Sequence, residues 1–502
     1  MNFYNISGIP ERIKNLLIRN IRNFRTLSNL YKYSDDSIKT YNKNRILGPR
    51  KYVCYAPFKS MYFTNNGNVQ ACCLNTKYVL GNISEQTIQE IWNGNNINLL
   101  REALSKNNLS IGCTPCRKRI ESHNYYAAEA MKYDVFPLKN THPVMLEFEL
   151  SHACNLNCIM CMSKNGSSND MYELNEKIYN DTFLSQLESY IPYLKKAKFI
   201  GGEPFYIPFY YKIWERIIKL NPACLILVQT NASILNEKIK TLLNTGKFRI
   251  SISIDSFRKE TYEMIRRNAH FENVMKNLRF FSEHAKKNNY QLSIAVCPMQ
   301  QNWEELYEIV QKCNDLNAQI YFNTVVEPQD CTLKSVDIVV LSNVVNKLEN
   351  FTLPTKKNIE NYNKKHFQSF VNQLKAWLSE KIDTDKLMYQ KSLYWEQQKN
   401  DIEKTPLEEH LQNISYHLSS FVDSDKGKIL CKKKLQDYMS HIQKILFGLN
   451  DFPYLKHFLL YLKEFSPALI CEVLDTDDES YIKAKIDEVK QKLISEISYK
   501  DV

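Results

Sequence analysis

The stretch Glu149-Leu150-Ser151-His152-Ala153-Cys154-Asn155-Leu156-Asn157-Cys158-Ile159-Met160-Cys161 determines how the rest of the chain is interpreted. Its three cysteines lie within eight residues and follow an apolar run, 144–150, that is typical of a strand. Soft thiolate ligands at this density favour an iron–sulfur cluster or zinc. Because only three thiolates are present, a four-iron cluster held here would keep one iron open to a small molecule.

Downstream of this loop, the sequence alternates regularly between apolar strands and amphipathic helices up to about residue 326. The expected strands are 144–150, 197–200, 225–229, 249–254, 292–296 and 319–325, and the expected helices are 184–193, 209–220, 235–243, 271–286 and 303–313. Six strands joined in this way predict a parallel sheet with right-handed crossovers, either an open sheet or a partial barrel. In both architectures functional residues lie at the carboxyl ends of the strands.

Polar residues follow each of the first four expected strands. The triple-cysteine loop follows the first, Gly201-Gly202-Glu203-Pro204 the second, Thr230-Asn231-Ala232 the third and Asp255-Ser256 the fourth. Glycine permits positive φ and close approach of the backbone to a ligand, and the Glu203 carboxylate can bind a cationic amine. Taken alone, the glycine segment is only a turn, and Asp255 can serve as a helix cap. Their shared position after consecutive strands favours a functional site.

Five further cysteines lie upstream, between residues 51 and 119. Residues 59–64 and 68–72 are expected strands around Asn65-Asn66-Gly67, a strong signal for a hairpin turn. The hairpin brings Cys54 close to Cys72 or Cys73, and Cys113-Thr114-Pro115-Cys116 supplies two more sulfurs. Four sulfurs predict a closed site for zinc or for a fully ligated iron–sulfur cluster, and their spacing favours neither.

The composition, with 44% hydrophobic and 24% charged residues among 502, is that of a folded protein, and no apolar run approaches eighteen residues. The amino terminus lacks a secretory signal, so we expect a cytoplasmic protein whose fourteen cysteines are metal ligands or core residues. Net charge is +11, and the pattern of residues 10–31 predicts a basic amphipathic helix. Such a helix can bind a membrane or nucleic acid, but docking onto its own protein is favoured.

The motif Cys154-x-x-x-Cys158-x-x-Cys161, followed about forty residues later by Gly201-Gly202-Glu203-Pro204, resembles the radical S-adenosylmethionine (SAM) enzymes. This resemblance covers residues 142–330 and implies an α/β fold with a partial (βα)6 barrel. It also implies that the three cysteines hold a four-iron, four-sulfur cluster. The open iron of that cluster would bind SAM through its amino and carboxylate groups.

The same resemblance implies further contacts with SAM. The segment from Gly201 to Pro204 would meet the methionine amino group, with Glu203 as the acceptor. Residues at positions that commonly line the SAM pocket or pair with its carboxylate are Asn231, Ser253, Asp255 and Arg266 or Arg267. Met160 departs from the family pattern, because many members carry an aromatic residue there. The motifs do not identify a catalytic residue beyond these contacts.

The upstream cysteine-rich segment is similar to the twitch and SPASM modules, which hold auxiliary iron–sulfur clusters. Twelve residues separate Cys54 from Gly67 and four separate Gly67 from Cys72, as in their opening pattern, and Cys113-x-x-Cys116 matches their later pair. The further cysteines of a two-cluster module do not follow Cys116. The resemblance therefore implies one auxiliary cluster, rather than zinc, although such modules usually follow the barrel.

The sequence thus predicts four regions: an amphipathic segment at 1–48, a twitch/SPASM-like module at 49–125, a radical SAM barrel at 142–330 and a mostly helical extension at 331–502. By resemblance, the reaction is the reductive cleavage of SAM to a 5′-deoxyadenosyl radical, which abstracts hydrogen from a substrate. The expected partners are a flavodoxin- or ferredoxin-like electron donor and a peptide or small-molecule substrate, with a peptide or protein side chain preferred. The alternatives are a nucleic-acid- or sugar-modifying enzyme and a non-catalytic electron-transfer protein.

Overall fold

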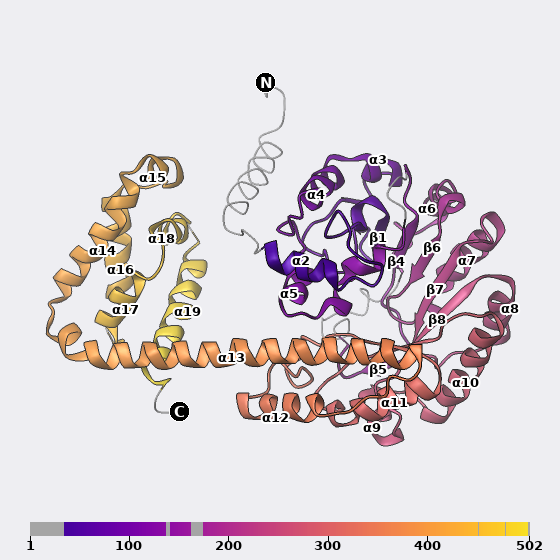
Figure 1. Ribbon diagram of the computed structural model, residues 1–502. Helices are drawn as coiled ribbons and strands as arrows, with labels where there is room; N and C mark the ends of the chain where they lie inside the picture. The colour runs from indigo at the N-terminus through magenta and orange to yellow at the C-terminus, as the bar shows by residue number, and fades with distance from the viewer. Residues whose placement is uncertain (1–34, 137–140, 162–173, 450, 477, 500–502) are drawn as a thin grey trace. The chain divides into compact units, whose positions relative to one another are not determined.

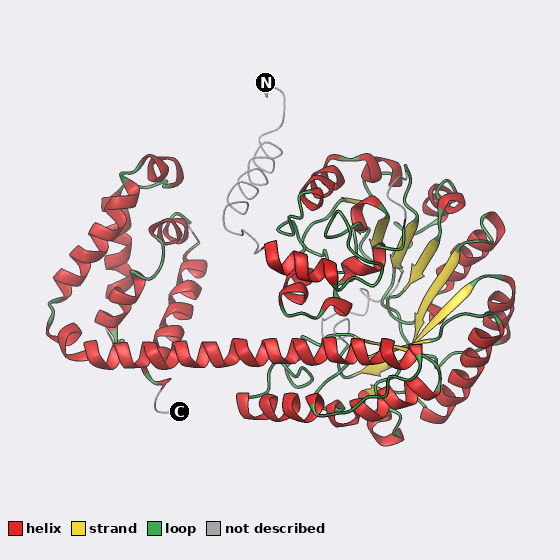
Figure 2. Cartoon of the chain, viewed as in Figure 1, coloured by secondary structure: helices red, strands yellow, loops and turns green. Residues whose placement is uncertain are grey.

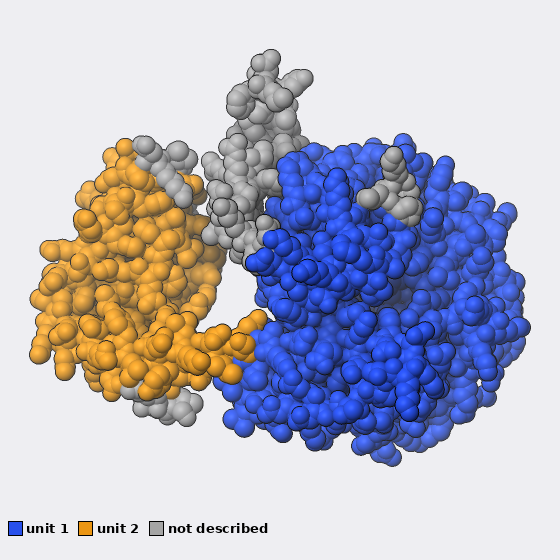
Figure 3. All heavy atoms as spheres, viewed as in Figure 1, with its two compact units in different colours: residues 1–378 blue, residues 379–502 orange. Residues whose placement is uncertain are grey.

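The computed structural model describes residues 35–136, 141–161, 174–449, 451–476 and 478–499 (Figure 1). The amphipathic helix expected at residues 10–31 lies outside these ranges. The described chain divides into two compact units, one ending at Leu378 and the other beginning at Ser379 (Figure 3). Among the helices in these ranges, none combines the length and the apolar character that crossing a bilayer requires.

A nine-stranded sheet in the order β11-β10-β8-β7-β6-β4-β1-β2-β3 forms the centre of the first unit (Figures 1 and 2). Six of its strands pair in parallel and follow one another along the chain: β4 (Met145–Glu149), β6 (Lys196–Phe199), β7 (Leu225–Thr230), β8 (Phe248–Ser253), β10 (Ser293–Val296) and β11 (Gln319–Phe322). The expected α/β architecture of partial-barrel type is confirmed. The barrel is not closed, since β11 and β3 form the two edges of the described sheet.

Helices between these strands cover one face of the sheet (Figure 1). They are α6 (Asp181–Glu188), α7 (Pro208–Leu220), α8 (Glu237–Thr245), α9 (Lys259–Ile265), α10 (Phe271–Lys287) and α11 (Leu306–Asp315). Strand β6 shows how the sequence separates the two faces: Ala197 and Phe199 are fully buried, whereas Lys196 and Lys198 alternate with them and keep partial exposure. Apolar residues therefore face the helices, and polar residues face the other side.

The cysteine-rich module is joined to this sheet rather than standing apart from it. Strands β1 (Ser60–Thr64) and β2 (Asn68–Gln70) form the expected hairpin, in which Gly67 has a φ of +83°, and β3 (Gly81–Asn82) follows. Strand β1 pairs in parallel with β4, with Tyr62 opposite Glu147. The remaining elements of the module are α2 (Asp35–Lys43), η1 (Ala56–Phe58), α3 (Ile88–Asn93), α4 (Asn95–Ser105), α5 (Thr114–Glu121), η2 (Tyr125–Ala127) and η3 (Glu129–Tyr133).

The carboxyl-terminal region is helical, as expected. Helix α12 (Ile338–Glu349) belongs to the first unit, and the boundary between the units falls within α13 (Asn358–Lys404). The second unit continues with α14 (Leu407–Val422), α15 (Asp425–Leu430), α16 (Leu435–Phe447), α17 (Leu455–Leu462), α18 (Pro467–Leu474) and α19 (Glu479–Ile497). Its own apolar core includes Trp395, Ile414, Tyr438, Leu459 and Leu493.

Candidate functional site

The triple-cysteine loop follows the carboxyl end of β4 and is held there by hydrogen bonds. Within it, β5 (Asn157–Cys158) pairs antiparallel with β9 (Arg266–Arg267), and the Ile159 amide donates to the Ile265 carbonyl oxygen at 2.9 Å. Cys154, Cys158 and Cys161 are all half-buried. The loop is therefore anchored to the segment that follows β8, and its three thiols remain partly accessible.

The two glycines after β6 hold this loop in place. The Gly202 amide donates to the Ser151 carbonyl at 3.0 Å, and the Glu203 amide donates to the Ala153 carbonyl at 2.8 Å. Gly201 has a φ of +118°, and a Cβ on Gly202 would lie 1.9 Å from the Ala153 oxygen. We expected these glycines to allow close approach of the backbone to a ligand. In the structure they allow close approach to the chain itself, just before the first cysteine.

Glu203 is fully buried in the same turn. Its carboxylate accepts hydrogen bonds from the Thr230 hydroxyl at 2.7 Å, the Asn231 amide at 2.7 Å and the Phe205 amide at 3.1 Å. Burial raises the pKa of the carboxyl to about 7, against these hydrogen bonds, which lower it. Because a carboxylate offers about four acceptor positions, one position remains for a ligand such as an amine.

Asn231 connects the end of β7 to the cysteine loop. Its side-chain nitrogen lies 3.1 Å from the Asn155 side-chain oxygen and 3.8 Å from the Cys154 sulfur. Ser253, the last residue of β8, is half-buried opposite Ala295. Both residues thus lie at the carboxyl ends of their strands, and Asn231 contacts the loop.

Asp255 and Arg266 form a buried ion pair at 2.8 Å. Asp255 also accepts from the Cys297 amide at 2.7 Å, and burial raises its pKa although Arg266 opposes the shift. The Arg266 guanidinium lies 3.9 Å from the Cys158 sulfur, whereas Arg267 is exposed. A ligand carboxylate at this site would therefore share Arg266 with Asp255.

Tyr262, in α9, is a residue of this site that the sequence motifs did not identify. It is fully buried, and its hydroxyl has no hydrogen-bond partner among the described residues. The charges of Arg266, Asp255 and Cys158 act on this hydroxyl. A buried hydroxyl without a partner is costly unless a ligand satisfies it. No sequence signal marks this tyrosine, because it lies on a helix and outside both motifs.

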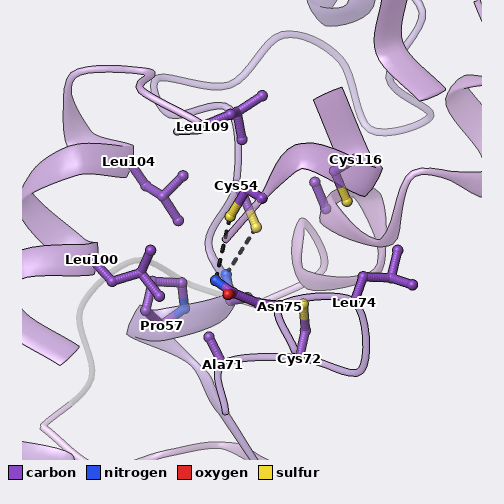
Figure 4. Close-up of a pocket in the computed structure, with 13 residues that line it drawn as sticks. Cys54, Pro57, Ala71, Cys72, Leu74, Asn75, Leu100, Leu104, Leu109 and Cys116 are labelled. Atoms are coloured by element: carbon purple, nitrogen blue, oxygen red, sulfur yellow. Dashed lines mark hydrogen bonds between the residues drawn. The ribbon is translucent and has the colours of Figure 1, made fainter. Parts of the chain in front are cut away.

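A second group of thiols lines one cavity in the amino-terminal module (Figure 4). The four cysteines are Cys54, Cys72, Cys113 and Cys116, and most other wall residues are apolar, among them Pro57, Ala71, Leu74, Leu100, Leu104 and Leu109. The Asn75 side-chain nitrogen lies 3.5 Å from the Cys113 sulfur. Cys73 does not line this cavity, and the charges that act on its thiol are those of Glu129, Lys198, Lys132 and Glu147.

The donors of this cavity suit a thiolate-ligated metal centre. Burial raises the pKa of Cys54 to about 12 and also raises the pKa of the other three thiols. Four neighbouring thiols in an apolar cavity can ionise together only if a cation lies among them, and a metal centre supplies that charge. Within the described residues, no group of three or more His, Cys, Asp or Glu side chains has the arrangement that would hold a single metal ion.

The two groups of cysteines lie toward opposite ends of the sheet. Strand β1 runs parallel to β4, so Cys54, which precedes β1, and Cys72, which follows the antiparallel β2, lie toward the amino end of β4. The triple-cysteine loop follows the carboxyl end of β4. A five-residue strand spans about 17 Å, so the two groups are separated by a distance of about that order.

Between these ends, the sheet carries a surface that we call the polar face, formed by Glu147, Lys198, Gln229, Ser251 and Tyr321. Lys198 donates to Glu147 at 3.3 Å, and the Tyr321 hydroxyl lies 2.8 Å from the Ser251 hydroxyl and 3.0 Å from the Gln229 oxygen. The sequence motifs do not identify this face. The signal was present, since strict alternation in the β6 and β8 sequences indicates one polar side.

Comparison with known proteins agrees with this geometry. Residues 148–313 match the radical SAM superfamily, and residues 54–117 match an iron–sulfur cluster-binding domain called SPASM. The prediction of a radical SAM domain preceded by an auxiliary-cluster module is therefore confirmed. The radical SAM domain implies a bound four-iron, four-sulfur cluster and SAM, and the SPASM domain implies auxiliary iron–sulfur clusters.

Curated relatives are distant and match only part of the chain. GTP 3',8-cyclase of Clostridium botulinum (strain Hall) is 27% identical over 133 residues, which are 26% of this chain and 41% of the relative. GTP 3',8-cyclase of Limosilactobacillus fermentum is 26% identical over 179 residues, 35% of this chain and 52% of the relative. The chain thus spans about half the length of these relatives or less. Among solved structures, Streptococcus suis SuiB bound to S-adenosylmethionine shares 14% identity over 50% of this chain and 57% of that chain, with a TM-score of 0.33.

Proposed function

We propose that this chain reductively cleaves SAM, with Cys154, Cys158 and Cys161 holding a four-iron cluster whose open iron binds SAM. The observation that carries the proposal is the convergence of the cysteine loop, the glycine turn, the end of β7 and the Asp255–Arg266 pair at one end of the sheet. When bound and reduced, the cluster would supply one electron to SAM, whose carbon–sulfur bond would break to give methionine and a 5′-deoxyadenosyl radical. This chemistry requires an external electron donor.

The residues around the loop have separate roles in this proposal. Glu203 accepts a hydrogen bond from the SAM amino group at its remaining acceptor position. Arg266, fixed by Asp255 and lying 3.9 Å from the Cys158 sulfur, favours the thiolate form of that cysteine by its charge. The unpartnered Tyr262 hydroxyl donates to SAM. Together these side chains orient SAM and keep water from the open iron.

The substrate, in this proposal, lies against the polar face, between the SAM site and an auxiliary cluster held by Cys54, Cys72, Cys113 and Cys116. Tyr133 of η3 donates a hydrogen bond to Glu147 on the polar face, so the module that carries these four cysteines borders this face. Hydrogen abstraction from a peptide or protein side chain stays a prediction from the sequence. The auxiliary cluster would accept an electron from the substrate or orient it.

Formation of 5′-deoxyadenosine tests the proposed activity. The anaerobically purified, reduced protein is expected to convert SAM to 5′-deoxyadenosine, and Cys158→Ser should abolish this product. Cys224→Ser is the matched control, since Cys224 is a buried thiol outside both groups of cysteines. Activity that survives Cys158→Ser, or a fully loaded wild type that forms no 5′-deoxyadenosine, would refute the proposal.

Metal content tests the auxiliary site separately. Two four-iron clusters correspond to about eight irons per chain. About four irons with one zinc would show that Cys54, Cys72, Cys113 and Cys116 hold zinc, and would remove the auxiliary cluster from the proposal.

A further inference from the structure

Four cationic side chains gather around the polar face: Lys132 of η3, Lys196 and Lys198 of β6, and Arg249 of β8. Lys196 is the first residue of β6 and Arg249 the second of β8, so both belong to the amino-terminal half of the sheet. Alternation places Lys196 on the same side of β6 as Lys198. This end of the sheet is opposite to the end that carries the triple-cysteine loop.

Two of the four cations have carboxylate partners. Lys132 pairs with Glu129 at 2.7 Å, and Lys198 pairs with the fully buried Glu147 at 3.3 Å. Burial alone raises the pKa of Glu129, but the charges of Lys132 and Lys198 lower it to about 2. Glu129 is therefore ionised at neutral pH, and each of these two lysines is balanced by one carboxylate.

Lys196 and Arg249 have no carboxylate partner among the described residues. Within the described part of the chain, Arg249 donates only to neutral acceptors: the Gln291 carbonyl at 3.0 Å, the Ser293 hydroxyl at 3.2 Å and the Gln319 side-chain oxygen at 2.6 Å. The Lys196 ammonium lies 5.3 Å from the centre of the Phe136 ring. Burial, and then the charge of Arg249, lowers the pKa of Lys196, so the two cations disfavour each other.

A buried ring nitrogen in α13 also lacks a partner among the described residues. The Nε2 atom of His366 in α13 has no partner among the described residues, and the residue is only 8% exposed. Its ring contacts the rings of Tyr126 and Tyr362, with centroids 4.7 and 4.4 Å away. The Tyr362 hydroxyl interacts electrostatically with both Arg249 and Lys132. A buried ring nitrogen without a partner indicates a missing polar ligand.

A surface cavity lies beside the two tyrosines that contact His366. Tyr126 and Tyr362 lie in its wall together with Lys43, His123 and Lys365, and the described lining residues include no aspartate or glutamate. Tyr362, in the cavity wall, also feels the charges of Arg249 and Lys132. The lining of the cavity therefore favours the entry of an anionic molecule.

We propose that Lys196 and Arg249 bind an anionic group of the substrate, either a carboxylate or a phosphate. The proposal rests on the proposed function, because it places the substrate on the polar face with its anionic group at the amino end and SAM at the carboxyl end. Two uncompensated, partly buried cations are costly in the free protein, and an anion between them provides the missing charge. The planar Arg249 guanidinium and the mobile Lys196 ammonium suit both kinds of oxyanion.

Calorimetric titration of the full-length, cluster-loaded protein with inorganic pyrophosphate and with glutarate, at constant ionic strength, tests this site. We expect saturable binding of at least one probe with a Kd of about 1 mM or below. Lys196→Met and Arg249→Met should each weaken binding about tenfold or more, because each removes a hydrogen bond between charged groups. Lys196→Arg should restore most of the affinity. Lys195→Met is the matched control, since the exposed Lys195 adjoins Lys196 in the chain.

The two probes distinguish the chemical source of the anion. Preference for pyrophosphate indicates a phosphorylated substrate, and preference for glutarate indicates a carboxylate. Failure of both probes to bind, or binding that Lys196→Met leaves within twofold of the wild type, overturns the proposal. Arg249→Met removes three hydrogen bonds and can misfold. Lys196→Met leaves these hydrogen bonds in place, so it tests the site even if Arg249→Met does not fold. Binding does not depend on SAM cleavage, so absence of 5′-deoxyadenosine would refute the proposed function and leave the anion site intact.

Discussion

Gly202→Ala probes the contact that positions the first cysteine of the loop. The added Cβ would lie 1.9 Å from the Ala153 carbonyl oxygen, whereas ordinary contacts begin at 3.4 Å, so about 1.5 Å of separation is missing. The obstructing atom belongs to the backbone, so no side-chain rotation relieves the overlap. The segment before Cys154 must therefore move by about that amount, yet metal–ligand distances tolerate only about 0.2 Å.

We expect Gly202→Ala to reduce the iron content from about eight to about four per chain, because only the loop cluster is affected. Overpacking of this kind should also lower the free energy of unfolding by about 3 kcal/mol. Iron and sulfide analysis with thermal unfolding measures both effects. Gly448→Ala is the matched control, since a Cβ there meets its nearest atom at 3.4 Å and needs no rearrangement. Full iron content and wild-type 5′-deoxyadenosine formation in Gly202→Ala would refute the reasoning.

Three further changes test individual residues. Cys72→Ser should remove about four irons per chain, whereas Cys73→Ser should remove none, because only Cys72 lines the thiol cavity. If iron analysis shows the reverse, Cys73 and not Cys72 is the cluster ligand. The pKa of Glu203 is raised from 4.5 to about 7 in the folded protein. As pH rises, the carboxyl therefore ionises in the unfolded chain before it ionises in the folded one. The SAM-free protein should lose about 3 kcal/mol of stability over that interval. Urea unfolding at pH 4.5 and 7.5 should show that Glu203→Gln lacks this loss, and equal losses in both proteins would contradict the assignment. Tyr262→Phe should raise the melting temperature of the SAM-free protein or leave it unchanged, because the buried hydroxyl that it removes has no described partner. It should weaken SAM binding about tenfold by equilibrium dialysis, and unchanged affinity would exclude contact with SAM.

The sequence predicted those parts of the fold and site that depend on local patterns. Alternating strands and helices defined the parallel sheet, and the Asn65-Asn66-Gly67 turn defined the hairpin because both signals lie within a few residues. The addition of β1 to the sheet beside β4 was not predictable in this way. It pairs Ser60 with Met145, far apart in the sequence, and nothing local in either strand specifies that partner.

The candidate site shows the same limit. Cysteine and glycine spacing identified the loop and the turn, but Gly202 contacts the chain itself, and Arg266 is already paired with Asp255. Tyr262 lies in no motif, so only the folded structure reveals its buried hydroxyl. The polar face is different, because its alternation was visible in β6 and was interpreted only as a strand. Charge on alternate residues of a parallel strand indicates that one face is not packed by helices.

Electron paramagnetic resonance of the reduced loop cluster, with and without SAM, tests the central claim most directly. Cys72→Ser is the suitable background, since removal of the auxiliary cluster leaves the loop cluster as the source of the signal. We expect SAM to shift the spectrum, because SAM binds the iron that Cys154, Cys158 and Cys161 leave open. A fully reduced loop cluster whose spectrum does not change at saturating SAM would contradict that claim.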